Sequence, residues 1–317
     1  MRALVVRDGK LQLQNNYNRP KPHPGEALVK IILAGICSTD LEIIKGYMGF
    51  EGVPGHEFVG IVEEAENKKL IGKRVVGTIN AACGECEMCR AGLDGHCPTR
   101  TVLGIYRRDG VFAEYTVLPA VNLLEVPDGV ADEEAVFCEP LAAAIQILEQ
   151  VKVRPSAQVA VVGPGRLGLL IGQVLADTGC NVTMLGRTAS SLKLAEEFGL
   201  QCSLVSEAKD DSYDLVVEAT GNPEGFAHSL RIVRPRGTMV LKSTFATKSE
   251  LDLTKIVVAE ITVVGSRCGP FAPALDLLSQ DRVWVREMIA KEFRLQDGLE
   301  AMEYATSPGV KKVLVRP

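Results

Sequence analysis

Residues 159–168 read VAVVGPGRLG, and this stretch decides the class of fold. An apolar strand runs into G-x-G-x-x-G and an apolar helix follows, which is the context that gives this otherwise weak motif its meaning. The first glycine makes a tight turn, the second lets a pyrophosphate approach the backbone, and the third lets the helix pack on the strand. The alternative is a glycine-rich turn without a ligand. The sequence predicts dinucleotide binding, with the phosphates at the helix N-terminus, by Gly163, Pro164, Gly165, Arg166, Leu167 and Gly168.

The next predicted strand ends without the acidic residue that usually binds the ribose 2′-hydroxyl of NAD. The sequence there is VTMLG, so Gly186 occupies the expected acidic position, and Arg187 and Thr188 follow. Loss of the carboxylate removes a repulsion against a 2′-phosphate, and the Arg187 guanidinium can pair with that phosphate. We therefore expect NADP rather than NAD, bound in part by Gly186, Arg187 and Thr188. The alternative is that Arg187 is an ordinary solvated arginine.

Strand and helix patterns alternate from Pro140 to about Pro270. Apolar residues repeat at helical spacing after Pro140, which occupies the favoured first turn of that helix. Strands are predicted at Gln158–Gly163, Asn181–Gly186, Gln201–Val205, Tyr213–Thr220, Gly237–Thr244 and Glu260–Arg267, and helices between them at Ala189–Phe198 and Glu224–Val233. This alternation predicts a doubly wound parallel sheet covered by helices.

The preceding part of the chain, up to about Leu141, is predicted to form short strands separated by turns. These strands are expected at Leu4–Val6, Ala27–Ala34, Val59–Glu63, Arg74–Thr78 and Phe112–Val117. The pattern is typical of a small, irregular β-barrel. A helix and a last strand, Lys312–Val315, remain after Pro270 and are too short to form a domain of their own. The sequence thus predicts an α/β protein with one domain from 1–140 and 271–317 and another from 141–270.

Four cysteines lie in one short loop of the first domain, residues 83–97, with the spacing C-x2-C-x2-C-x7-C. Four thiolates in one loop can surround a tetrahedral zinc ion. Disulfides are the alternative, but the nine cysteines are odd in number and no secretory signal is evident. The sequence therefore predicts a structural zinc bound by Cys83, Cys86, Cys89 and Cys97.

Composition and charge narrow the range of partners. The chain has 317 residues and a net charge of −5, and its basic residues are scattered. Neither nucleic acid nor an anionic membrane is therefore an expected partner. No apolar run is long enough to span a bilayer, and the first residues read as a strand rather than as a targeting peptide. Cysteines in metal-binding spacing without a secretory context predict a reducing cytoplasm.

A second metal site can be assembled from three separated segments. Gly35-Ile-Cys37-Ser-Thr39-Asp40 holds a thiol beside a hydroxyl and a carboxylate, Pro54-Gly-His56-Glu57 holds an imidazole, and Cys138-Glu139-Pro-Leu holds a carboxylate. None is specific alone, because an isolated cysteine or histidine is usually a packing or surface residue.

Taken together, these segments resemble the zinc-dependent medium-chain dehydrogenases/reductases, which include alcohol, sorbitol, threonine and glucose dehydrogenases. The resemblance covers nearly the whole chain. It includes CSTDL, GHEFVG, the four-cysteine loop, DGVFAEYTVLPAVNLLEVPDGV, CEPLAAA, the glycine motif and EATGNPEGFAHSLRIVRPRGTMVL. It implies a GroES-like β-barrel catalytic domain, a Rossmann domain, two zinc ions per chain and an alcohol or polyol dehydrogenase activity; the preference for NADP(H) and the cytoplasmic location are expected from the residues described above.

The resemblance also implies site residues. Cys37, His56 and Glu139 would bind the catalytic zinc and leave one position open. Glu139 rests on the E-P-L form of polyol-type members, whereas alcohol dehydrogenases proper have cysteine there, so Cys138 remains the alternative. The catalytic residues beside the metal would be Asp40, which orients His56, Glu57, which modulates or temporarily replaces a ligand, and Thr39, which passes on the substrate proton.

Three departures from the family pattern are evident. A histidine often found five residues after the first cysteine is Glu42 here, so the outer proton relay must differ. The segments on either side of the cysteine loop are compact, so substrate identity does not carry over. Lys311 or Lys312 falls where members often place a basic residue that contacts the cofactor, and a solvated lysine is the alternative there.

The expected partner is a small alcohol or carbonyl substrate, and the resemblance suggests a homodimer or homotetramer. Other interpretations are a zinc-free reductase of the same superfamily acting on enones or quinones, a zinc-ribbon protein that binds nucleic acid, and an inactive dehydrogenase that senses the cofactor. Enone and quinone reductases generally lack the Cys37, His56 and Glu139 set. The net charge of −5 argues against the zinc ribbon.

Overall fold

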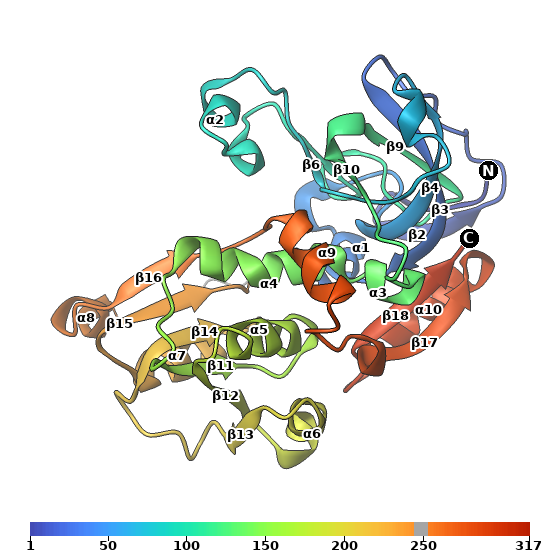
Figure 1. The fold of residues 1–317 in the computed structure, drawn as a ribbon. Helices are drawn as coiled ribbons and strands as arrows, with labels where there is room; N and C mark the ends of the chain where they lie inside the picture. The colour runs from blue at the N-terminus through green and yellow to red at the C-terminus, as the bar shows by residue number, and fades with distance from the viewer. Residues whose placement is uncertain (244–252) are drawn as a thin grey trace. The chain divides into compact units, whose positions relative to one another are not determined.

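The structure, a computed structural model, describes residues 1–243 and 253–317 (Figure 1). The chain forms two compact units. Unit 1 contains Met1–Glu139, Phe271–Gln280 and Met288–Pro317, and unit 2 contains Pro140–Pro270 and Asp281–Glu287. The segment Asp281–Glu287 therefore groups with unit 2 rather than with the rest of 271–317.

Unit 1 is built around a seven-stranded sheet in the order β10-β5-β4-β3-β18-β17, with β9 also paired to β3. Unit 1 as a whole contains the strands β1 (Ala3–Arg7), β2 (Lys10–Gln14), β3 (Glu26–Gly35), β4 (Glu57–Ala65), β5 (Arg74–Gly77), β6 (Asn80–Ala81), β7 (Thr101–Leu103), β8 (Arg107–Arg108), β9 (Tyr115–Pro119), β10 (Leu123–Glu125), β17 (Ile289–Arg294) and β18 (Lys312–Arg316). The pair β1-β2 and the set β6-β7-β8 form two separate small sheets. The helices of unit 1 are α1 (Ser38–Ile44), α2 (Glu87–Arg90), α3 (Asp132–Ala135), α9 (Phe271–Ser279) and α10 (Gly298–Ala305). The first two residues of α4 (Cys138–Gln150) also belong to unit 1, and the rest of α4 belongs to unit 2.

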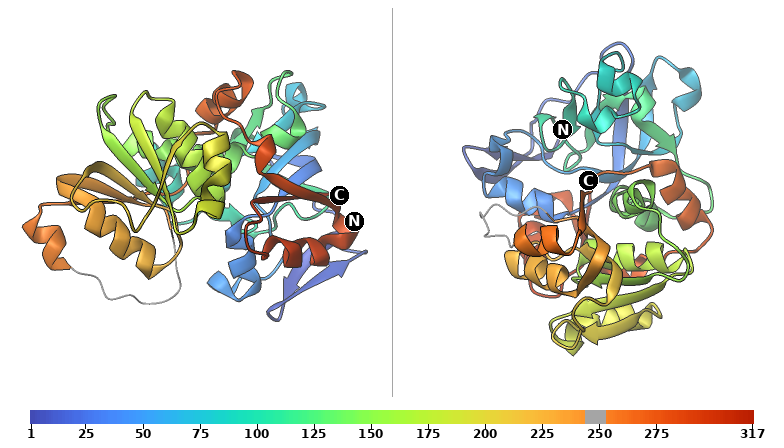
Figure 2. Two further views of the ribbon diagram at one scale, coloured as in Figure 1. Left: turned by 90° about the horizontal axis from the view of Figure 1, so that it is seen from below. Right: turned by 90° about the vertical axis from the view of Figure 1, so that its left-hand side faces the viewer.

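The last strand of the chain lies in the middle of this sheet. β18 pairs antiparallel with β3 on one side and parallel with β17 on the other. Both chain ends therefore belong to unit 1, and Figures 1 and 2 show them close together. The sequence predicted the return of this strand but missed β17, since most residues of β17 are exposed and give no apolar signal.

One predicted strand of unit 1 was misplaced. Phe112–Val117 was expected to be a strand, but β9 begins only at Tyr115 and continues to Pro119. Phe112 is fully buried, and its carbonyl accepts a hydrogen bond from the backbone N–H of Leu4. The apolar character of Phe112 therefore comes from core packing outside a strand.

Unit 2 contains a six-stranded parallel sheet in the order β13-β12-β11-β14-β15-β16. Its strands are β11 (Gln158–Val162), β12 (Asn181–Gly186), β13 (Gln201–Leu204), β14 (Tyr213–Glu218), β15 (Val233–Leu241) and β16 (Thr262–Gly265). Its helices are α5 (Arg166–Ala176), α6 (Ala189–Glu197), α7 (Pro223–Ile232) and α8 (Leu253–Val258). Unit 2 also contains α4 from Pro140 onward.

The order of these strands is that of a Rossmann fold, in which the strand order reverses between the first and fourth strands. Here these are β11 and β14, and the glycine motif follows β11 directly. Helices α5 and α6 pack on β11–β13, and α7 packs on β14 and β15. The predicted doubly wound sheet is confirmed. The predicted strand Gly237–Thr244 starts earlier, at Val233, and its end at Thr244 lies outside the described residues.

Within the described part of the chain, no helix combines the length and the apolar character that crossing a bilayer requires.

Candidate metal centres and cofactor site

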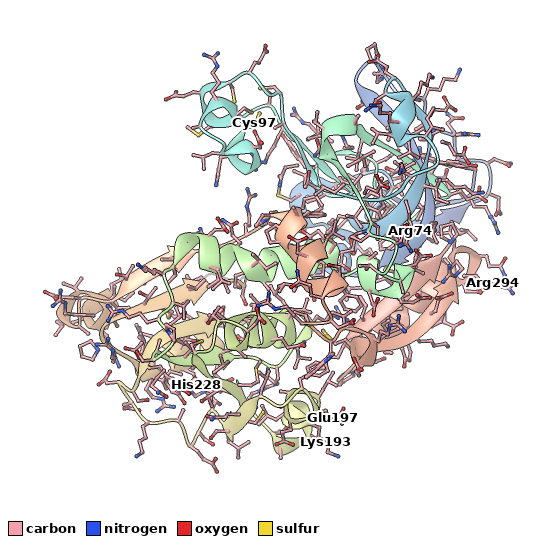
Figure 3. All side chains as sticks on the ribbon, in the orientation of Figure 1. Arg74, Cys97, Lys193, Glu197, His228 and Arg294 are labelled. Atoms are coloured by element: carbon pink, nitrogen blue, oxygen red, sulfur yellow. The ribbon has the colours of Figure 1, made fainter. Side chains whose placement is uncertain are left out.

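Four cysteine sulfurs gather in the loop between β6 and β7. The Sγ atoms of Cys83, Cys86, Cys89 and Cys97 all lie within 4.8 Å of one another. The Cys86–Cys89, Cys83–Cys97 and Cys83–Cys89 pairs are 3.5, 3.6 and 4.0 Å apart. Four sulfurs bound at about 2.3 Å to a tetrahedral zinc would lie about 3.8 Å apart, so this set fits the ion. Figure 3 labels Cys97 in this loop, which extends away from the strands of unit 1.

The surroundings of these cysteines differ: hydrogen bonds from the Glu85 and Cys86 backbone lower the pKa of Cys83, whereas burial raises the pKa of Cys89 to about 12. A hydrogen bond with the Thr99 hydroxyl, 3.4 Å from Cys97 Sγ, and one with the Cys83 backbone lower the pKa of Cys97 to about 6. Every cysteine in the described chain is a free thiol. A thiolate is the form that binds a metal, so Cys97 is prepared for this role.

A second group of metal-binding atoms meets elsewhere in unit 1. Atoms of Cys37, His56 and Glu57 lie within 4.8 Å of one another. Cys37 precedes α1 shortly after β3 ends, and the other two residues lead into β4. The antiparallel pairing of β3 with β4 places Gly35 opposite Glu57, and so brings the two segments together. A thiolate, an imidazole and a carboxylate form a donor set that suits zinc.

Asp40 orients two members of this group. One of its carboxylate oxygens lies 3.1 Å from Nδ1 of His56, and the other accepts a hydrogen bond of 2.8 Å from the Cys37 backbone N–H. Because Nδ1 faces Asp40, Nε2 of the ring is left for a metal. Burial lowers the pKa of His56, but the Asp40 carboxylate and Cys37 raise it well above its ordinary value. A bound metal ion would compete with that proton.

The backbone before His56 is fixed by close packing. Gly55 has a φ of +99°, and a Cβ atom on it would lie 2.8 Å from the Phe112 ring. Cβ atoms on Gly104 and Gly110 would each lie 2.1 Å from the carbonyl oxygen of Gly55. No side chain fits at any of these three positions, so the segment that carries His56 is held in place by backbone contacts.

Thr39 lies beside the metal-binding atoms, with its Oγ1 3.7 Å from the Sγ of Cys37. Glu42, which replaces the histidine of a common proton relay, is exposed and forms an ion pair of 2.8 Å with Lys45. The hydroxyl of Thr39 is therefore close to the group of donors, whereas Glu42 is directed to solvent.

The glycine motif of unit 2 has the geometry that its sequence predicted. Gly163 has a φ of +108°, and a Cβ on Gly168 would lie 1.9 Å from the carbonyl oxygen of Gly163. Helix α5 therefore starts directly over the turn. Gly165 is its N-cap and provides no side-chain cap, and the N-terminus of the helix, with its partial positive charge, follows the turn directly.

The end of β12 also has the predicted character. A Cβ on Gly186, the last residue of the strand, would lie 2.7 Å from Oγ of Ser191. Thr188 is the N-cap of α6, accepts a hydrogen bond of 3.3 Å from the Ser191 N–H, and has its hydroxyl 3.1 Å from that of Ser190. Arg187 is exposed beside them. This corner presents hydroxyls and a guanidinium and no carboxylate from residues 186–191.

Known proteins share both units. Residues 23–128 match the model "Alcohol dehydrogenase GroES-like domain", and residues 167–280 match "Zinc-binding dehydrogenase". Sorbitol dehydrogenase from Halalkalibacterium halodurans is 30% identical over 324 residues, which cover 94% of each chain. This chain belongs to the zinc-dependent medium-chain dehydrogenases/reductases.

Solved structures of this family share the fold over the whole chain. A protein described as a zinc-binding dehydrogenase from Sinorhizobium meliloti 1021, bound to NADP, has a TM-score of 0.91 at 30% identity and covers 100% of this chain and 99% of its own. A protein described as a short chain alcohol dehydrogenase (rspB) from E. coli CFT073, complexed with NADH, has a TM-score of 0.91 at 28% identity, with the same coverage. The family therefore includes members crystallised with either nucleotide.

The structure bears on the choice between Cys138 and Glu139. Cys138 is buried, and its thiol lies 3.7 Å from the carbonyl oxygen of Phe271. Burial, with the nearby Glu139 carboxylate, raises the pKa of Cys138 well above its ordinary value. Cys138 thus has the features of a packed, protonated thiol. Glu139 is half-buried in the first turn of α4, and the carboxylate grouped with Cys37 and His56 is Glu57. Ligation of zinc by Glu139 stays a prediction.

The sequence reasoning missed the position of Lys312. Its side chain is 2% exposed and forms an ion pair with Glu57, so it is neither solvated nor on the surface. A lysine that opens the apolar run Val313–Val315 was the available signal, since a charged residue in a buried strand needs a partner.

We expect the zinc-dependent dehydrogenase to hold two zinc ions per chain when purified without chelator. The variant Cys83→Ser/Cys86→Ser should lose one of them and unfold at a lower temperature, because a structural zinc contributes directly to folding. Elemental analysis and thermal unfolding measure both effects. The control Cys202→Ser, at a thiol outside both groups, should keep both ions. A double variant that retains both metals and full stability would contradict the assignment.

A second prediction separates the two neighbours at the start of α4. Glu139→Ala should reduce turnover by about 100-fold or more while nucleotide binding survives, since loss even of groups that support a metal ligand costs up to about that factor. Cys138→Ala should keep most activity. Steady-state rates, bound zinc and nucleotide fluorescence titrations test this. An active Glu139→Ala with an inactive, zinc-poor Cys138→Ala would move the ligand to the thiol.

Proposed function

We propose that this protein is a zinc-dependent alcohol or polyol dehydrogenase that transfers a hydride reversibly between a CH–OH group and NADP. The observation that carries the proposal is the group formed by Cys37, His56 and Glu57, with Asp40 beside the histidine ring. We assign the catalytic domain, predicted at 1–140 with 271–317, to unit 1. We assign the nucleotide-binding domain, predicted at 141–270, to unit 2, which also contains Asp281–Glu287.

The residues of unit 1 support such a reaction. Cys37 and His56, with Glu139 as the predicted third ligand, would hold a zinc ion, and Asp40 would keep the imidazole in the tautomer that binds through Nε2. When bound, the metal acts as a Lewis acid that lowers the pKa of an alcohol. The Thr39 hydroxyl would accept the proton that the alcohol loses. Glu42 points to solvent with Lys45, so the proton must continue by a route other than the usual histidine.

Secondary alcohols, polyols and sugars are the proposed substrate class. The relatives include sorbitol dehydrogenase, D-arabitol-phosphate dehydrogenase from Enterococcus avium and erythritol/L-threitol dehydrogenase from Mycolicibacterium smegmatis, at 27–30% identity. A carboxylate in the ligand set leaves the centre less thiolate-rich than a Cys2His set, which suits an oxygen-rich substrate. The alternative, a zinc-free enone or quinone reductase, leaves the Cys37, His56 and Glu57 group without a role.

Two further proposals concern the oligomeric state of the protein and the cellular compartment in which it works. β16 is one of the two edge strands in the sheet of unit 2 as the described residues form it, and Val257 and Val258 of α8 are 74% and 78% exposed. An exposed edge strand with apolar neighbours suits pairing with a second copy, so we propose a homodimer or homotetramer. The free thiols agree with a reducing cytoplasm.

The preference for NADP has a direct test. Arg187→Ala should weaken NADP(H) binding while NAD(H) binding stays nearly unchanged, since a charge-assisted bond to phosphate contributes about 1.5–3 kcal/mol. Lys193→Ala, which removes a charge farther along α6, is the matched control. Fluorescence titrations with both nucleotides measure the effect. Tighter binding of NAD than of NADP by the unmodified protein would refute the preference.

The activity itself is tested by an NADP(H)-linked screen over alcohols, polyols, aldoses and aldehydes, followed at the absorbance of the reduced nicotinamide. We expect turnover of at least one polyol or secondary alcohol, its loss on chelation and its recovery on addition of zinc, because the metal activates the alcohol. Chelator-resistant reduction of enones, without alcohol oxidation, would favour the zinc-free reductase.

A further inference from the structure

Lys312 adds a buried ionisable side chain to those of Asp40, His56 and Glu57 at the metal-binding group of unit 1. Its side chain is 2% exposed, and its ammonium forms an ion pair with Oε2 of Glu57, which is 1% exposed. The two residues are 255 positions apart in the sequence. Burial of a lysine is costly unless a counter-charge accompanies it. Glu57 provides that charge and is at the same time grouped with Cys37 and His56.

The two oxygens of the Glu57 carboxylate have different surroundings. Oε2 is bound by Lys312, whereas Oε1 is buried and has no hydrogen-bond partner in the protein. A buried carboxylate oxygen without a partner carries a desolvation cost that a cation can relieve. The oxygen that Lys312 leaves free is therefore the one suited to a metal ion.

The position of the ammonium is fixed from several sides. β18, which begins with Lys312, pairs with the end of β3, and the Val313 carbonyl accepts a hydrogen bond from the Ile36 N–H. The Lys312 ammonium lies 5.3 Å from the centre of the Phe137 ring, within reach of its electron-rich face. The ion pair also occupies the space above Gly35, where a Cβ atom would lie 2.5 Å from Oε2 of Glu57.

We propose that Lys312 is a positioning residue of the metal centre, which holds one oxygen of Glu57 and so restricts this carboxylate to a single, weakened bond to the metal. This inference rests on the proposed catalytic zinc. The ammonium withdraws electron density from the carboxylate and keeps Oε2 away from the ion. Glu57 is then a ligand that can be released when a substrate oxygen arrives, since a carboxylate bound through both oxygens would crowd the open position.

An ion pair that only stabilised the fold would behave differently. Replacement of either partner would change the stability of the protein, because it leaves an uncompensated buried charge, but the affinity and coordination of the metal would stay the same. Two substitutions of Lys312 distinguish these cases because they should move the zinc affinity in opposite directions.

In Lys312→Met the ammonium is lost and both oxygens of Glu57 become available. The dissociation constant of the zinc at Cys37 should fall about tenfold or more, the size of effect expected for groups that support metal ligands. Cobalt(II) at this centre should show weaker visible absorption, as four-coordination gives way to five. In Lys312→Arg a guanidinium can bind both oxygens in a bidentate pair, and the zinc should bind about tenfold more weakly.

The experiment uses the intact protein and follows zinc release to a chromophoric chelator, with thermal unfolding to verify that each variant is folded. Zinc held by Cys83 and its neighbours gives a separate phase that should be equal in all variants. Lys311→Met, which removes the same charge one residue earlier, should leave the Cys37 phase unchanged. If Lys312→Met does not fold, Lys312→Arg alone decides.

Two failures are distinguishable. Unmodified protein with one zinc, held by the cysteine loop, would overturn the catalytic metal centre and with it the proposed function. Unmodified protein with two zincs, and folded Lys312 variants with unchanged zinc affinity and cobalt spectrum, would overturn the role of Lys312 alone.

Discussion

The centre of unit 1 depends on the compensation of buried charge. Asp40, His56, Glu57 and Lys312 are all at most 3% exposed, and they form two close pairs beside Cys37, Asp40 with His56 and Glu57 with Lys312. Buried pairs stabilise a fold little, because desolvation offsets most of their attraction. Apolar residues of similar size would serve the core equally well. The arrangement is explained when the two pairs are seen as the supports of a cation, which Cys37, His56 and Glu57 surround.

Backbone packing makes this arrangement possible. The chain approaches itself closely at Gly55, where the neighbouring Gly104 and Gly110 leave no room for side chains. Gly35 likewise leaves room for the Glu57–Lys312 pair, because a Cβ atom on Gly35 would occupy the space that the Glu57 carboxylate fills. The C-terminal strand β18 then completes the centre by supplying Lys312 next to the end of β3. A chain that ended before β18 would lack both a strand of the sheet and the partner of Glu57.

How much of this could be predicted from the sequence depends on how far apart the interacting residues are. The turn at Gly163 and the cysteine loop are contiguous motifs, and each contains the residues that fix its geometry. The central strands β11 and β14 of unit 2 were predictable because most of their residues are buried and apolar, whereas the edge strands β13 and β16 are not buried. Polar β17 gave no such signal. The Glu57–Lys312 pair depends on the pairing of β18 with β3, and no local pattern encodes the partner of a lysine so distant in the sequence.

The two carboxylates proposed as zinc ligands, Glu57 and Glu139, differ in how much each requires the metal. Glu139 is half-buried in the first turn of α4, where the partial positive charge of the helix N-terminus favours an anion. Glu57 is buried, and one of its oxygens has no partner in the protein. Without a metal, the unfavourable desolvation therefore falls on Glu57. A centre in which Glu57 binds the ion at rest and Glu139 replaces it during turnover would reconcile the resemblance, which points to Glu139, with the geometry, which groups Glu57 with Cys37 and His56. In such a centre the ion pair with Lys312 would govern the exchange, because it determines how firmly Glu57 can hold the metal.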